Sequence, residues 1–194
     1  MSDVGASFAG VVASMGPLEA LDRTEITDPE LLEAIERSDR TGLPGSWLIR
    51  LFARQPESAR LMVPMLDTLN RGDALSSRLK ELVRSLLAGM VGDAYYAGPR
   101  SQEAIDEGVT PELLAAARTD YEDDPRLTDR ERLALRYAEQ LFLDSKKIGD
   151  EFYADLKSQF TEPEIMELGT FASLTYGLCV VTASLGARPE YDEQ

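Results

Sequence analysis

The sequence predicts an all-α protein that folds as a single helical domain. The chain of 194 residues carries repeated helix-start signals and a helical hydrophobic period at its centre, and no segment alternates as a half-exposed strand would. Its length suits one domain with a sizeable core, and no shift in composition divides it. We therefore expect one domain over residues 1–194.

The first half begins with three expected helices. Asp28 can cap a helix whose first turn holds Pro29, and this helix is expected to end near Thr41-Gly42. A short apolar helix is predicted over 47–53 and a longer one over 56–69, in which Pro64 is expected to introduce a kink. Together these segments predict a helical N-terminal half.

The clearest helical period lies in the middle of the chain. Apolar residues recur there three and four positions apart, at Leu79, Leu82, Val83, Leu86, Leu87, Met90 and Val91. Three later helices begin at Thr110-Pro111 and at two capping boxes, Thr128 with Glu131 and Thr161 with Glu164. The last helix is apolar or small from Leu168 to Leu185, which predicts burial on all sides, in the core or in a subunit interface.

The net charge of −15 argues against binding to polyanions, because docking on phosphates requires clustered Lys and Arg. We expect no nucleic-acid partner. The densest acidic run, Asp120 to Asp124, is expected to be a solvated loop, with cation binding as the alternative. No signal peptide or membrane span is expected, so the default prediction is a cytoplasmic protein.

The chain has one cysteine, Cys179, and no histidine. An intramolecular disulfide is impossible, and a zinc site built on His and Cys is excluded by composition, so no metal site is predicted. Without histidine, any acid–base chemistry would depend on carboxylates, Tyr, Lys or Cys179. Because its neighbours are apolar, Cys179 is expected to be a core thiol, with a low-pKa peroxidatic thiol as the alternative.

The segment KELVRSLLAGMVGDAYYAGPR, residues 80–100, resembles the active-site region of the carboxymuconolactone decarboxylase and AhpD-like alkylhydroperoxidase families. The family pattern is Glu, eleven residues, Cys-x-x-Cys, three residues and His. In this chain Glu81 matches the glutamate, Asp93 and Tyr96 take the cysteine positions, and Arg100 takes the histidine position. The resemblance extends over roughly residues 44 to 186 and leaves a variable N-terminal segment of about residues 1–43.

The resemblance implies an AhpD-like helical bundle with different chemistry from the redox-active members. In those members the second cysteine attacks a peroxide, the first resolves it as a disulfide, and the glutamate and histidine relay protons. A carboxylate and a phenol at positions 93 and 96 cannot pass through sulfenic acid and disulfide. The chain is therefore not expected to be a thiol peroxidase, and neither a cofactor nor a metal is implied.

Three residues are candidates for catalysis, namely Glu81, Asp93 and Tyr96. Burial would raise the pKa of Glu81 and suit it to proton transfer, whereas the structural alternative is a surface carboxylate paired with Lys80, Arg84 or Ser85. Asp93 either shares a pocket with Glu81 or caps a short helix.

Three further residues are candidates for binding substrate, namely Arg100, Tyr95 and Tyr176. Asp93, Tyr96 and Arg100 would share one face if residues 93–100 were helical, although Gly98-Pro99 could redirect Arg100. An Arg fork suits a carboxylate, and the structural alternative is an Asp93–Arg100 pair. At most one of the adjacent Tyr95 and Tyr96 would face the pocket centre, and Tyr176 could instead be a core residue.

The leading hypothesis is a redox-inactive, cofactor-independent lyase or isomerase that acts on a small anionic organic substrate. The rival is a non-catalytic oligomeric binding or scaffolding protein with a decayed site. Either protein would form a homo-oligomer, a dimer, trimer or hexamer. An empty site lined by Glu81, Asp93, Tyr96 and Arg100 would favour the enzyme, and a site filled by side chains would favour the rival.

Overall fold

The computed structural model describes residues 12–14, 17–72 and 74–189. In this part of the chain the regular secondary structure is helical apart from two short strands. The helices are α1 (Pro29–Thr41), α2 (Ser46–Phe52), α3 (Pro56–Arg71), α4 (Ser77–Val91), α5 (Gln102–Asp106), α6 (Pro111–Thr119), α7 (Asp129–Asp144), α8 (Asp150–Gln159) and α9 (Glu162–Ser184). Two 3₁₀ turns, η1 (Arg23–Glu25) and η2 (Ser145–Lys147), complete the set. The predicted all-α class is confirmed.

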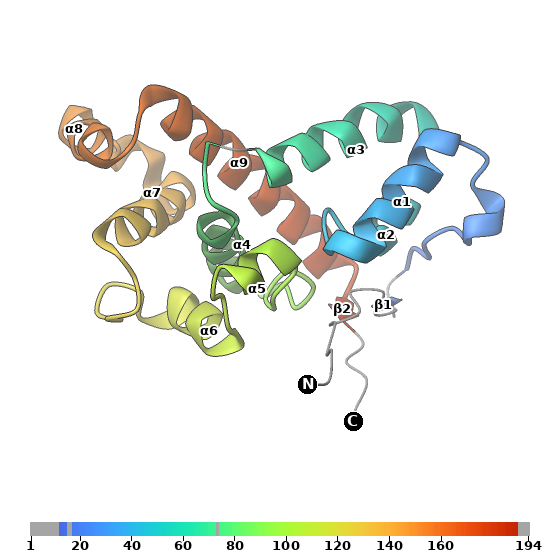
Figure 1. Cartoon of the computed structure of the whole chain (residues 1–194), viewed down its shortest axis with the longest axis horizontal. Helices are drawn as coiled ribbons and strands as arrows, with labels where there is room; N and C mark the ends of the chain where they lie inside the picture. Colours follow the sequence, from blue (N-terminus) through green and yellow to red (C-terminus); the bar gives the residue numbers. More distant parts are fainter. Residues whose placement is uncertain (1–11, 15–16, 73, 190–194) are drawn as a thin grey trace.

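The helices are arranged around α4. Figure 1 shows α6, α7 and α8 at one end of the molecule, α1, α2 and α3 at the other, and α9 running between the two ends. Helix α4 packs against α6, α7 and α9, and one large apolar cluster joins these helices. A smaller cluster, which includes Ile35, Ile49 and Val63, joins α1 to α2 and α3. Helix α1, in the segment expected to be variable, thus contributes to the packed core.

Helix ends follow the signals in the sequence. The Asp28 side chain caps α1 by accepting hydrogen bonds from the amides of Glu30 and Leu31, and Gly42 ends this helix with a positive φ of 86°. Both predicted capping boxes, at the starts of α7 and α9, are present. Helix α3 continues through Pro64 to Arg71.

Helix α4 is buried on all sides, although its sequence pattern suggested a polar face. Every residue from Leu79 to Ala88 is buried, including four polar ones. Lys80 is 2% exposed, and its ammonium group donates to the carbonyl of Gly72 at 2.7 Å and pairs with Glu167 of α9 at 2.7 Å. The hydroxyl of Ser85 donates to the carbonyls of Ala97 and Leu114. The polar face is therefore satisfied inside the protein rather than by water.

Within the single chain, the stretch of α9 from Leu168 to Ser184 is not buried on all sides, because Val180 and Val181 are 44% and 45% exposed. Burial of this face in a subunit interface stays a prediction. Among the described residues, α9 is the one helix long and apolar enough to span a membrane, a test that core helices of soluble proteins also pass. Its buried face packs against α4 and α7, as that of a core helix does.

Neither the two strands nor helix α8 was expected from the sequence. Strands β1 (Val12–Ser14) and β2 (Ala187–Pro189) pair antiparallel and bring the two ends of the described chain together (Figure 1). Helix α8 begins at Asp150, its N-cap residue Gly149 provides no side-chain hydrogen bond, and it buries only Leu156, so its sequence signal is weak.

Candidate functional site

The centre of the candidate site is a buried ion pair on α4. Glu81 is 1% exposed; one of its carboxylate oxygens accepts from Arg84, three residues later, and the other accepts from the backbone amide of Arg100. Arg84 is also buried and donates to the side-chain carbonyl of Asn70 at 2.6 Å. Both carboxylate oxygens of Glu81 are therefore engaged. Arg84 was one of the three partners named for Glu81 in the structural alternative, but the pair lies in the core rather than at the surface.

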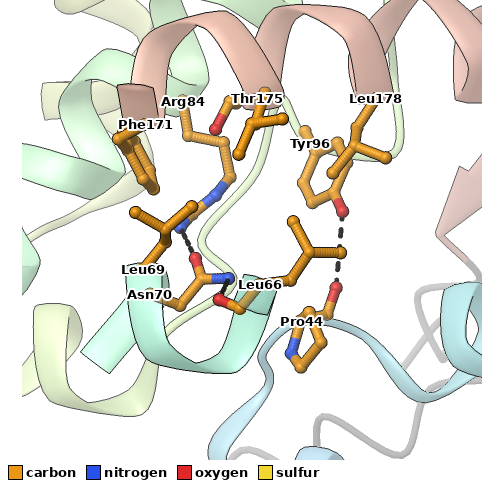
Figure 2. A pocket seen from close by; sticks show the side chains of 10 residues that line it. Pro44, Leu66, Leu69, Asn70, Arg84, Tyr96, Phe171, Thr175 and Leu178 are labelled. Atoms are coloured by element: carbon orange, nitrogen blue, oxygen red, sulfur yellow. Dashed lines mark hydrogen bonds between the residues drawn. The ribbon is translucent and has the colours of Figure 1, made fainter. Parts of the chain in front are cut away.

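A small cavity lies beside Arg84, between α3, α4 and α9 (Figure 2). It measures about 10 Å³, which is close to the space that one water occupies. Most of the wall is apolar, with polar groups from Asn70, Arg84, Tyr96 and Thr175. The lining residues are Pro44, Leu66, Leu69, Asn70, Arg84, Tyr96, Phe171, Leu174, Thr175 and Leu178.

Two hydrogen bonds fix the polar side chains around this cavity. The Tyr96 hydroxyl donates to the carbonyl of Pro44 at 3.3 Å, and the Asn70 amide donates to the carbonyl of Leu66 at 2.8 Å (Figure 2). Asn70 thereby turns its own carbonyl oxygen toward Arg84. Burial raises the pKa of Tyr96 well above its usual value, so the phenol is a hydrogen-bond donor at neutral pH.

The segment from Asp93 to Arg100 is a series of turns, so the prediction of a shared helical face is wrong. Gly92 ends α4 with a φ of 70°, and the Asp93 carboxylate accepts from the amides of Tyr95 at 3.1 Å and Tyr96 at 3.2 Å. Pro99 has no amide hydrogen to continue a helix. Asp93 therefore caps a turn, and Arg100 is positioned independently of it.

Asp93 lies against α9 rather than at the cavity. Burial raises the pKa of its carboxyl, while hydrogen bonds from Tyr95, Thr182, Tyr96 and Cys179 oppose this shift. Cys179 is fully buried, and burial together with the nearby Asp93 charge raises the pKa of its thiol. Because Cys179 is on a different helix, no sequence spacing could have placed it beside Asp93. This thiol is protonated and shielded.

Tyr95 and Arg100 stack on each other. The Arg100 guanidinium carbon is 4.1 Å from the centroid of the Tyr95 ring, and this ring also contacts Trp47 with a centroid distance of 5.2 Å. Neither Tyr95 nor Arg100 lines the cavity. Of the two adjacent tyrosines, only Tyr96 faces it.

Tyr176 is half-buried and stacks on Phe142 at 3.9 Å, and it does not line the cavity. The structure thus places one of the six predicted site residues, Tyr96, at the cavity. Glu81 is one contact away, through Arg84. In the sequence analysis Arg84 was named only as a structural partner of Glu81. The signal for this pair was the opposite charge of Arg84 three residues after Glu81 on one helix.

No group of three or more His, Cys, Asp or Glu side chains within the described ranges is arranged to hold a metal ion. The polar groups around the cavity are one cation, one amide and two hydroxyls. Such a set suits an anionic or hydrogen-bond-accepting ligand.

Comparisons with known proteins bear on the fold. Neither a sequence model of a protein family nor a curated protein sequence matches the chain. Among solved structures, an uncharacterized peroxidase-related protein from Silicibacter sp. TM1040 is 17% identical, with a TM-score of 0.74 over 93% of this chain and 96% of that one. A peroxidase-related protein from Ralstonia eutropha JMP134, described as an AhpD core, is 16% identical, with a TM-score of 0.74 over 92% of this chain and 93% of that one.

The debrominase Bmp8 has a similar structure. Its complex with 2,3,4-tribromopyrrole, in a variant that replaces a cysteine by alanine, is 18% identical to this chain, with a TM-score of 0.73 over 91% of this chain and 94% of that one. The chain therefore has the AhpD-like fold. The resemblance seen in its sequence is confirmed at this level.

Proposed function

We propose that this chain is a redox-inactive AhpD-fold protein that acts as a cofactor-independent lyase or isomerase on a small anionic organic molecule. The observation that carries the proposal is that a buried guanidinium, Arg84, and a buried phenol, Tyr96, line the same cavity. Buried cations are retained at a cost in desolvation, and binding an anion is one use for them.

The proposed roles follow from these positions. Arg84 would hold the substrate carboxylate. Tyr96, which stays protonated, would exchange its hydrogen bond to the Pro44 carbonyl for one to an oxyanion that develops in the transition state. Glu81 would orient Arg84 and accept a proton once the substrate carboxylate takes over one of the guanidinium bonds. Asp93, which lies against α9 and outside the cavity, would position Tyr96 by accepting a hydrogen bond from its backbone amide.

A substrate must first open the cavity, because the free volume suits about one water. Leu66 and Leu69, on the last turns of α3, form part of the wall and are the side chains that would move. The complex of Bmp8 with a brominated pyrrole supports the idea that this fold can hold a small ring compound.

The second candidate is a non-catalytic binding or scaffolding protein. The engaged oxygens of Glu81 and the nearly filled cavity favour it, because neither leaves a free base next to a substrate. With either function we propose a homo-oligomeric protein of the cytoplasm, with a small molecule as its partner and without nucleic acid or membrane.

Ligand binding and turnover separate these candidates. Acetate, benzoate and pyrrole-2-carboxylate should be screened for thermal stabilisation of the full chain, since a ligand that binds only the native state raises its stability. A ligand that stabilises the protein and is converted, as followed by NMR, supports the enzyme. Stabilisation without conversion supports the binding protein.

A matched double variant shows whether the cavity is the site. Glu81→Gln with Arg84→Met removes both members of the ion pair together, so no buried charge is left alone. Loss of the thermal response in this variant, with an unchanged response in the surface variant Glu122→Gln, assigns the binding to the Arg84 cavity. An unchanged response in the double variant would contradict the assignment.

A further inference from the structure

A second polar cluster lies outside the Arg84 cavity, at Tyr95 and Arg100. The Tyr95 hydroxyl oxygen and the Arg100 Nε are both buried without a hydrogen-bond partner among the described residues. Both side chains border Gly45: a Cβ atom added there would overlap the Tyr95 hydroxyl and lie 3.5 Å from a terminal nitrogen of Arg100. Two polar groups that lack a partner other than each other therefore lie beside Gly45.

Both groups are hydrogen-bond donors. A guanidinium has five N–H donors and no acceptor. Burial raises the pKa of Tyr95 and outweighs the opposing charge of Arg100, so the hydroxyl keeps its proton at neutral pH. A tyrosine oxygen can accept from arginine, but its own hydrogen still needs an acceptor.

The nearby carboxylates are already engaged. Glu81 accepts from Arg84 and from the backbone amide of Arg100, while Asp93 accepts from the amides of Tyr95 and Tyr96. Within the described part of the chain, the Arg100 guanidinium pairs with no carboxylate, although the chain carries 35 Asp and Glu against 20 Lys and Arg. Unmatched buried donors are costly, and a ligand that accepts hydrogen bonds would remove this cost.

We propose that Tyr95 and Arg100 form a binding site for a small monovalent anion. The anion accepts hydrogen bonds from the Tyr95 hydroxyl and the Arg100 guanidinium, and it is either the carboxylate of a small acid or a halide. Gly45, with a φ of 111°, has no side chain, and the Tyr95 hydroxyl occupies the place that a Cβ atom would take, beside a terminal nitrogen of Arg100. The site is separate from the Arg84 cavity, whose lining includes none of these three residues.

Thermal unfolding of the full chain tests the proposal. Sodium formate and sodium bromide are titrated separately at constant ionic strength, with bulky sodium gluconate as the balancing salt. At an anion concentration of about ten times Kd, we expect the Tm of a chain of this size to rise by about 3–6 °C and to approach saturation. A response to formate alone indicates a carboxylate ligand, and a response to both salts indicates a general monovalent-anion site.

Three variants locate the effect. Arg100→Gln should abolish the response and Tyr95→Phe should weaken it, whereas Arg40→Gln, which removes the same charge from an exposed position on α1, should leave it unchanged. No saturable response in the unmodified chain, or a response that survives Arg100→Gln, overturns the proposal.

Crystallography of the unmodified chain tests the site even if a variant does not fold. Crystals grown with sodium bromide should show an anomalous peak within hydrogen-bond distance of both the Tyr95 hydroxyl and the Arg100 guanidinium. An ordered water alone at this position contradicts an anion site.

Discussion

Glu81 and Arg84 form an ion pair on consecutive turns of α4, and each side chain is 2% exposed. The pair lies beside the cavity between α3, α4 and α9, and the second oxygen of Glu81 accepts from the amide of Arg100. One carboxylate thus fixes both the guanidinium at the cavity and the backbone that follows the Asp93 turn. This position makes Glu81 a structural residue whatever its chemical role.

The first prediction concerns the stability of this pair. Glu81→Gln should lower the free energy of unfolding by about 3–5 kcal/mol, because Arg84 would be left as a buried charge without a counterion. Urea denaturation at pH 7 measures the change. Glu122→Gln is the matched control, since its pair with Arg136 is half-exposed and should contribute less than about 1 kcal/mol. Equal effects of the two substitutions would show that the buried pair is not formed.

The second prediction concerns Cys179. Its thiol is buried, and its pKa is raised by burial and by Asp93, so little thiolate is available as a nucleophile. A disulfide reagent should label the native protein only at the rate of unfolding and should label it at once in denaturant. Hydrogen peroxide should produce no sulfenic acid in the native protein, as mass spectrometry would detect. Rapid labelling of the native chain would revive a role for this thiol in peroxide chemistry.

The third prediction concerns the pH dependence that Asp93 contributes. Because its pKa is raised above 3.8 in the folded state, the folded protein holds this proton more tightly than the unfolded chain. The contribution of Asp93 to stability is therefore fully present at low pH and is lost as pH rises through the raised pKa.

Asp93→Asn removes this titration and keeps one of the two acceptor oxygens, so it retains the hydrogen bond from either the Tyr95 or the Tyr96 amide and loses the other at every pH. As pH is raised from about 4 to 7, the free energy of unfolding of the parent should fall relative to that of the variant. Urea denaturation at several pH values measures it. A difference that stays constant with pH would contradict a raised pKa.

The fourth prediction concerns the contact between Gly45 and Tyr95. Gly45→Ala should destabilise the protein by about 1–3 kcal/mol, because the new methyl group would overlap the Tyr95 hydroxyl and the positive φ is unfavourable for alanine. Tyr95→Phe in the same chain should recover part of this loss by removing the overlapping oxygen. Thermal or urea unfolding of the two single variants and the double variant gives the coupling. Additive effects would show that the two residues are not in contact.

Much of the fold could be predicted from local signals. The Asp28 cap, the two capping boxes and the 3.6-residue period near α4 act within a few residues, so the sequence displays them directly. Helix α8 lacks a side-chain cap and β1 and β2 pair across the whole chain, so neither had a local signal.

Helices α4 and α9 each lie in an environment different from the one that their sequences suggest. Helix α4 carries Lys80, Glu81 and Arg84, a pattern typical of a solvated face, but these charges are neutralised inside the core. Helix α9 has no charged residue from Leu168 to Ser184, yet it leaves Val180 and Val181 exposed. Hydrophobic periodicity ranks residues by their own polarity, whereas burial also depends on partners that other helices supply.

The sequence alone determined that this protein is helical and that disulfide redox chemistry at positions 93 and 96 is excluded, because both follow from residue types and short spacings. Only the tertiary structure decided which side chains meet. It put Arg84 and Tyr96 at the cavity, placed Cys179 against Asp93 and stacked Arg100 on Tyr95. These contacts join residues from different helices and turns, and their geometry is set by packing rather than by position along the chain.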